Sequence, residues 1–139
     1  MSPVRALRGA TTIDEDTRDH LHDRVIALLE AMFERNGLDH DQLVSVIFTA
    51  TADIHSAFPA EAARKFGLGD VPLLCAQELS IDGGTPYCVR VLMHLETDTS
   101  RSDLHHVYLE GARLDAPPSS ARVSSAARSA SPCVARGGT

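Results

Sequence analysis

Large apolar residues recur every three to four positions in the first third of the chain, which is the spacing of one helix face. The positions are Leu21, Val25, Leu28, Leu29, Met32 and Phe33. Asn36-Gly37 follows, and glycine commonly ends a helix. Thr12 and Glu15 have the spacing of a capping box, which predicts the start of the helix. The pattern indicates one long amphipathic helix.

Shorter apolar runs, rich in β-branched residues, predict strands on both sides of this helix. Arg8-Gly9 is expected to end the first of them. Asp82-Gly83-Gly84 is a turn signal, so the two strands around it are predicted to form a hairpin. The expected strands are residues 4–7, 43–50, 71–81, 87–97 and 105–112.

A second, shorter helix is predicted over residues 58–65, because Pro59 suits a first helical position and Gly67 or Gly69 can end it. The order strand, helix, strand, helix and three strands predicts an α+β fold, a mixed sheet with helices packed on one face. We expect one domain over residues 1–114. Residues 115–139 are rich in Ser, Ala, Arg and Pro, and we expect this tail to be mostly disordered.

Charge is unevenly distributed along the 139 residues, whose formal net charge is −6. Ten basic against 19 acidic residues give the part up to Asp115 a charge of −9, and three arginines give the tail +3. An acidic body argues against nucleic acid as a partner, because phosphates need a basic surface. No apolar run is long enough for a membrane span or a signal peptide.

Three cysteines are present, and no two of them have the spacing of a metal-binding or redox pair. We therefore expect no disulfide framework and a reducing, cytoplasmic location. The seven histidines also lack metal-ligand spacing, since His20 and His22 do not share a helix face and His105 and His106 point to opposite faces of a strand. No phosphate-binding loop and no nucleophile elbow occur. We expect neither a metal nor a cofactor.

Arg90 is the most informative charged residue, because Cys88, Val89, Val91, Leu92 and Met93 surround it. A buried guanidinium is costly unless an anion meets it, either a carboxylate of the protein or one of a ligand. Glu78 follows a similar apolar run. In the predicted hairpin the two residues could pair with each other or face one pocket, and the sequence leaves both open.

Other polar residues allow two interpretations each. Arg8 is either a ligand-binding residue at a strand end or a solvated charge. Arg64 and Lys65 are ordinarily surface charges, Tyr108 a core residue and Cys75 a small buried apolar residue. The residues alone therefore indicate a small α+β domain that binds a small polyanion.

Five segments in order resemble the AroH class of chorismate mutases. The resemblance begins at residues 4–12, which are similar to the family's opening RGIRGATT. It continues through a segment similar to SATPDLHAVFPA, the pattern VP…C.QE, and two final signatures. The later four segments are residues 49–60, 71–78, 88–93 and 106–110.

The resemblance implies a homotrimer that forms a pseudo-α/β barrel, with active sites in clefts between subunits. It implies a Claisen rearrangement of chorismate to prephenate, a step of phenylalanine and tyrosine biosynthesis that needs no cofactor, proton transfer or nucleophile. The enzyme holds a compact conformer and stabilises charge on the ether oxygen. In the family's pattern Arg90 contacts the ether oxygen and a carboxylate, and Arg8 and Tyr108 bind carboxylates. Glu78 and Cys75 bind the ring hydroxyl, and Phe58 and Leu74 form the apolar wall. Arg64 attracts the substrate from the rim of the neighbouring subunit.

The chain departs from the family after the last strand, where the usual LRPD is replaced by Leu114-Asp115-Ala116-Pro117. Arg113 or Arg122 is the candidate to replace the missing tail arginine. Two other functions are alternatives. One is a non-catalytic trimeric module that binds a small carboxylate, and the other is an imine deaminase of similar architecture, whose signatures the sequence lacks.

Overall fold

The computed structural model of the protein describes residues 2–112. The predicted tail, with Arg113 and Arg122, lies outside the described residues. The strands are β1 (Val4–Thr12), β2 (Leu43–Ala50), β3 (Leu73–Gln77), β4 (Cys88–Glu96) and β5 (Val107–Tyr108). The helices are α1 (Arg18–Asn36) and α2 (Pro59–Phe66), and 3₁₀ turns cover His40–Gln42 and Arg101–Asp103.

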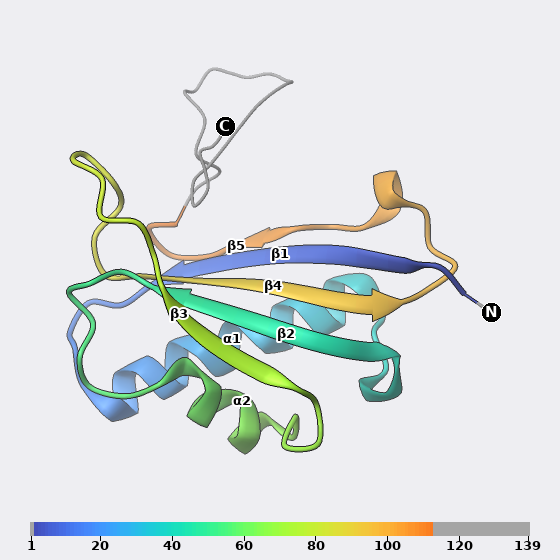
Figure 1. Cartoon of the computed structure of the whole chain (residues 1–139), viewed down its shortest axis with the longest axis horizontal. Helices are drawn as coiled ribbons and strands as arrows, with labels where there is room; N and C mark the ends of the chain where they lie inside the picture. Colours follow the sequence, from blue (N-terminus) through green and yellow to red (C-terminus); the bar gives the residue numbers. More distant parts are fainter. Residues whose placement is uncertain (1, 113–139) are drawn as a thin grey trace.

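The five strands form one mixed sheet in the order β3-β2-β4-β1-β5 (Figure 1). Strand β4 is antiparallel to β1 and β2, whereas β3 runs parallel to β2 and β5 parallel to β1. Both helices pack against one face, where Leu7, Phe48 and Met93 join the core residues of α1. The predicted α+β fold with a mixed sheet is confirmed. In residues 2–112 no helix combines the length and apolar character that a bilayer crossing requires.

Strand β1 is longer than predicted, because Arg8 and Gly9 lie inside it instead of ending it. A Cβ atom on Gly9 would lie 2.5 Å from the sulfur of Met32 and 3.2 Å from Cδ1 of Leu28. The glycine therefore allows a close approach of β1 to α1, and it does not interrupt the strand.

We expect Gly9→Ala to lower the free energy of unfolding by about 1–3 kcal/mol, because the added methyl group overpacks the contact between strand and helix. Urea unfolding of the variant and the wild type measures the difference. Gly69→Ala is the matched control, since a Cβ at Gly69 meets nothing within 4 Å. An equal effect of both substitutions would contradict the close-packing explanation.

The predicted hairpin between the third and fourth strands is wrong, because β2 lies between β3 and β4. Phe48 of β2 pairs with Cys75 of β3 on one side and with Val91 of β4 on the other. The turn signal at residues 82–84 lies in a loop between β3 and β4, in which Gly83 has φ 85°. Glu78 and Arg90 are therefore not on neighbouring strands.

Further element boundaries also differ from the prediction. The third strand is expected over residues 71–81 and covers only Leu73–Gln77. The helix α1 starts after Thr17, whose side chain accepts a hydrogen bond from His20 N. Thr12 is still in β1, paired with Cys88, so it cannot cap the helix. The last strand is only Val107–Tyr108. The second strand and the helix end at Gly37 (φ 57°) agree with the prediction.

Candidate active site

One row of side chains crosses the helix-free face of the sheet at Arg90. Arg90 pairs with Thr49 of β2 on one side and with Ala10 of β1 on the other, and Ala10 pairs with Tyr108 of β5. Directly paired residues point to the same face of a sheet. The neighbours of Arg90 in β4, Val89 and Val91, are buried against the helices. Thr49, Arg90 and Tyr108 therefore share the opposite, helix-free face.

Glu78 joins this row from the end of β3. Its backbone N–H donates to Ala50 O at 2.9 Å, which carries the parallel pairing one residue past the strand. Its carboxylate accepts a hydrogen bond from Thr49 Oγ1 at 3.1 Å and lies 3.8 Å from Arg90 Nε. The Arg90 and Glu78 side chains are only 19% and 13% exposed. The two charges are thus held together at the surface of the sheet, with Thr49 between their strands.

Arg8 and Tyr108 extend the row toward the other edge of the sheet. Arg8 precedes Ala10 by two residues in β1 and points to the same face, where it is exposed. Tyr108 packs against a small cluster made by Ala10, Cys88 and Ala112. We call Arg8, Glu78, Arg90 and Tyr108 the sheet-face group.

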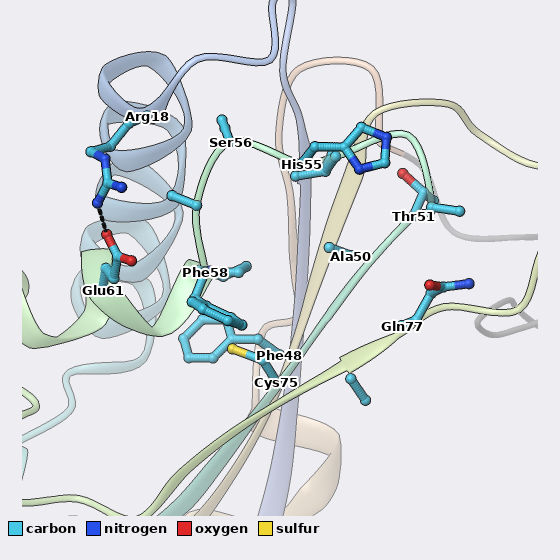
Figure 2. A pocket seen from close by; sticks show the side chains of 15 residues that line it. Arg18, Phe48, Ala50, Thr51, His55, Ser56, Phe58, Glu61, Cys75 and Gln77 are labelled. Atoms are coloured by element: carbon cyan, nitrogen blue, oxygen red, sulfur yellow. Dashed lines mark hydrogen bonds and ion pairs between the residues drawn. The ribbon is translucent and has the colours of Figure 1, made fainter.

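Three of the four remaining predicted residues lie on or near α2. Phe58 and Cys75 line a cavity of about 450 Å³ between the end of β3, the loop before α2 and the start of α2 (Figure 2). Phe58 is 66% exposed. An ion pair between Arg18 and Glu61 lies at the rim (Figure 2). Arg64, in the last turn of α2, is exposed. We call Phe58, Arg64 and Cys75 the pocket group.

Two groups of α2 influence the pKa of Cys75. Burial raises the pKa of the Cys75 thiol above its ordinary value, against the opposing effects of the Ala60 backbone and the charge of Arg64. The positive charge of Arg64 therefore acts at Cys75, where it favours the thiolate form. The thiol remains protonated at neutral pH, which suits a hydrogen-bonding residue more than a nucleophile.

The two groups lie on opposite faces of the sheet. Cys75 pairs with Phe48, a core residue, and so faces the helices. Glu78 contacts Thr49 and Arg90 on the helix-free face. Leu74, next to Cys75 in the edge strand, points away from the helices and is 59% exposed. A single chain therefore does not bring Cys75 and Glu78 together around one small ligand.

Two polar residues beside the sheet-face group were not singled out as site residues from the sequence. Thr49 hydrogen-bonds Glu78, and His106 Nδ1 accepts a hydrogen bond from Arg8 N at 3.0 Å. Thr49 begins one of the five family-like segments and His106 begins another. Their partners lie on other strands, so neither contact has a local sequence signal. Among residues 2–112, no group of three or more His, Cys, Asp or Glu is placed to hold a metal ion.

Comparisons with known proteins identify the family of the chain. The family model described as chorismate mutase type I matches residues 4–117. Relatives named "Chorismate mutase AroH" are 48% identical over 113 residues in Thermus thermophilus and 39% identical over 108 residues in Bacillus subtilis (strain 168). These alignments cover 80% and 77% of this chain, and 93% and 85% of the relatives.

A solved structure of a chorismate mutase from Clostridium thermocellum is also similar, with a TM-score of 0.76 and 44% sequence identity. The match covers 78% of this chain and 96% of that one. The chain belongs to the chorismate mutase type I family, a family of isomerases (EC 5.4.99.5). Within it, the relatives identify an AroH-class chorismate mutase, and chorismate is the substrate that the family implies.

Proposed function

We propose that Arg90 catalyses the rearrangement of chorismate to prephenate by stabilising the negative charge that develops on the ether oxygen. In this step one C–O bond breaks as one C–C bond forms, and no proton is transferred. The observation that carries the proposal is the position of Arg90, a largely buried guanidinium held at the centre of a polar row beside Glu78. A fixed cation in a poorly solvated site stabilises developing charge more than water does.

The charges of the two groups match those of the substrate. Arg8 and Arg90 against Glu78 give the sheet-face group a charge of +1, and Arg64 gives the pocket group another +1. Together they balance a dicarboxylate. We propose that Arg8 and Tyr108 bind carboxylates, that Glu78 and Cys75 bind the ring hydroxyl, and that Phe58 and Leu74 form the apolar wall.

The active site is proposed to form between two copies of the chain in a homotrimer, whose sheets make a pseudo-α/β barrel. Two observations support this. The sheet-face and pocket groups lie on opposite faces of one sheet, and the helix-free face carries Ile47 and Leu92, two apolar residues, beside the exposed Leu74. A second copy that covers this face would bring its own pocket group to the sheet-face group.

The proposal extends to the rest of the chain and to its setting. Residues 1–114 form the catalytic domain, and the tail is proposed to close the site, with Arg113 or Arg122 replacing the family's tail arginine. A reducing, cytoplasmic location is proposed because the three cysteines of the sequence form no CxxC pair. Truncation after Leu114 tests the tail, since an unchanged KM would show that it does not close the site.

Purified protein mixed with chorismate tests the function directly. We expect chorismate to be consumed and prephenate to form in equal amounts, and the protein to have the mass of a trimer in solution. Binding of chorismate without turnover would favour a non-catalytic carboxylate-binding module. A stable monomer that turns over chorismate would support the reaction and contradict the site between subunits.

Thr49 is predicted to position Glu78. Thr49→Val keeps the shape of the side chain and removes the hydroxyl, so we expect kcat/KM to fall by about 10-fold or more, the usual effect of losing a hydrogen bond to a charged group. Thr49→Ser keeps the hydroxyl and is expected to stay within about threefold of wild type. Steady-state kinetics of both variants decide the point. Equal activity of the valine and serine variants would show that the hydrogen bond to Glu78 has no role.

A further inference from the structure

His106 makes an unusual hydrogen bond at the edge of the sheet. The backbone N–H of Arg8 donates to Nδ1 of the imidazole, at 3.0 Å. A backbone N–H can only donate, so Nδ1 carries no proton. The ring is therefore neutral, with its proton on Nε2. In this tautomer Nδ1 accepts the hydrogen bond from Arg8 N that a backbone carbonyl oxygen would otherwise accept where the pairing of β1 with β5 begins.

The main chain on both sides of His106 is fixed. Before it, Asn36 at the end of α1 accepts from His105 N at 2.7 Å and donates to His105 O at 2.9 Å. After it, Val107 is fully buried and pairs with Gly9. The imidazole thus joins the Arg8 backbone to a segment that α1 holds in place. This arrangement restricts the motion of residue 8, from which the Arg8 guanidinium extends.

The charge state of the ring agrees with this geometry. Desolvation of the ring, with smaller effects of Arg8 on β1 and of His105, lowers the pKa of His106 to about 4, although the residue as a whole is exposed. A protonated ring could not accept from Arg8 N and would repel the neighbouring guanidinium. The imidazole is therefore neutral over the pH range in which carboxylate ligands of the site are ionised.

We propose that His106 is a positioning residue, which holds Arg8 in place for binding a substrate carboxylate through the hydrogen bond from Arg8 N to Nδ1. This inference rests on the proposed role of Arg8 in substrate binding. It concerns binding more than the breaking bond, because Arg8 and His106 lie at the edge of the polar row and Arg90 lies at its centre.

Two substitutions test the acceptor role. His106→Leu removes the acceptor, and we expect KM for chorismate to rise about 5- to 10-fold with kcat within about twofold of wild type. His106→Asn places an amide oxygen near the position of Nδ1, and we expect it to restore KM to within about twofold. His105→Leu is the matched control, because His105 bonds Asn36 through its backbone only. An unchanged KM in His106→Leu, or equal defects in the Leu and Asn variants, would overturn the proposal.

A double-mutant cycle separates this inference from the proposed role of Arg8. In an Arg8→Ala background, His106→Leu should raise KM by no more than about twofold, because the guanidinium that His106 positions is already gone. A full 5- to 10-fold rise in that background would mean that His106 acts independently of Arg8. An unchanged KM in Arg8→Ala alone would instead refute the binding role of Arg8.

Nitrogen NMR of the wild-type protein tests the geometry without any substitution. We expect the His106 ring to show an unprotonated Nδ1 and a protonated Nε2 at neutral pH, and to take up a proton only near pH 4. A proton on Nδ1, or titration near the ordinary value of about 6.5, would contradict the hydrogen bond and with it the proposal.

Discussion

Replacing Arg90 by alanine is expected to lower kcat/KM for chorismate by about a hundred- to a thousandfold, since removal of one preorganised donor to a developing oxyanion commonly costs about 2.7–4 kcal/mol. The loss should appear mainly in kcat, because the charge on the ether oxygen is larger in the transition state than in bound chorismate. Steady-state measurement of prephenate formation gives both constants. The guanidinium is only 19% exposed, so water cannot easily take its place.

Two variants make the result interpretable. Arg90→Lys keeps the positive charge and loses the planar fork, so its activity should lie between those of wild type and Arg90→Ala. Arg101→Ala removes an exposed arginine of the 3₁₀ turn at Arg101–Asp103, and its kcat/KM should match the wild type. If Arg90→Ala lost less than about tenfold, the cation would not supply the main stabilisation of the transition state.

Mixing two inactive variants is expected to restore activity. Arg90→Ala damages the sheet-face group, and the double variant Phe58→Ala/Arg64→Ala damages the pocket group. In randomly mixed trimers with sites between subunits, about a quarter of the sites combine an intact sheet-face group with an intact pocket group. Activity after co-refolding of equal amounts should therefore approach about a quarter of the wild-type value, far above either variant alone.

The matched control mixes two variants of the same group. Arg90→Ala and Arg8→Ala both damage the sheet-face group, so no combination of their chains contains an intact one, and the activity of the mixture should not exceed the average of the two variants measured alone. If the first mixture also stays inactive although mixed trimers form, each site must be built from a single chain. That result would contradict the site between subunits and leave the chemistry of Arg90 untouched.

Local sequence patterns correctly predicted those elements that pack against the same core along their whole length. The stripe from Leu21 to Phe33 faces one core, and the strand at residues 43–50 and the helix end at Gly37 agree with the structure. The predicted element boundaries were wrong where a residue type occurs both at the ends of elements and inside a sheet. Gly9 reads as a strand end but allows Met32 to approach β1, and Thr12 has the spacing of a cap but lies in the sheet.

Strand order was harder to predict than strand existence. The turn signal at residues 82–84 favoured a hairpin, but the parallel pairing of β2 with β3 and the antiparallel pairing of β2 with β4 insert β2 between the two strands. The sequence therefore placed Glu78 near Arg90 on the basis of a hairpin that does not exist. Their contact crosses β2, where Thr49, which is 29 residues from Glu78 along the chain, donates a hydrogen bond to the Glu78 carboxylate.

The chemistry of the site was only partly visible in the sequence. Arg90 stands out because a charge among apolar residues needs an anion, and the structure places Glu78 3.8 Å from its Nε atom. Arg8, Tyr108 and Cys75 have no such contrast with their neighbours. The residues alone left the role of Arg8 open and favoured buried positions for Tyr108 and Cys75, and the family resemblance assigned all three to the site. His106 bonds a backbone group 98 residues away, a contact that no local pattern encodes.

The most direct measurement compares two rigid bicyclic dicarboxylates that mimic the transition state and differ only in having an ether oxygen or a methylene group at the breaking bond. The oxygen analogue should bind the wild type about 10-fold or more tightly than the methylene analogue, and the two should bind Arg90→Ala almost equally. The same preference for oxygen in both proteins would show that the Arg90 guanidinium does not meet that atom.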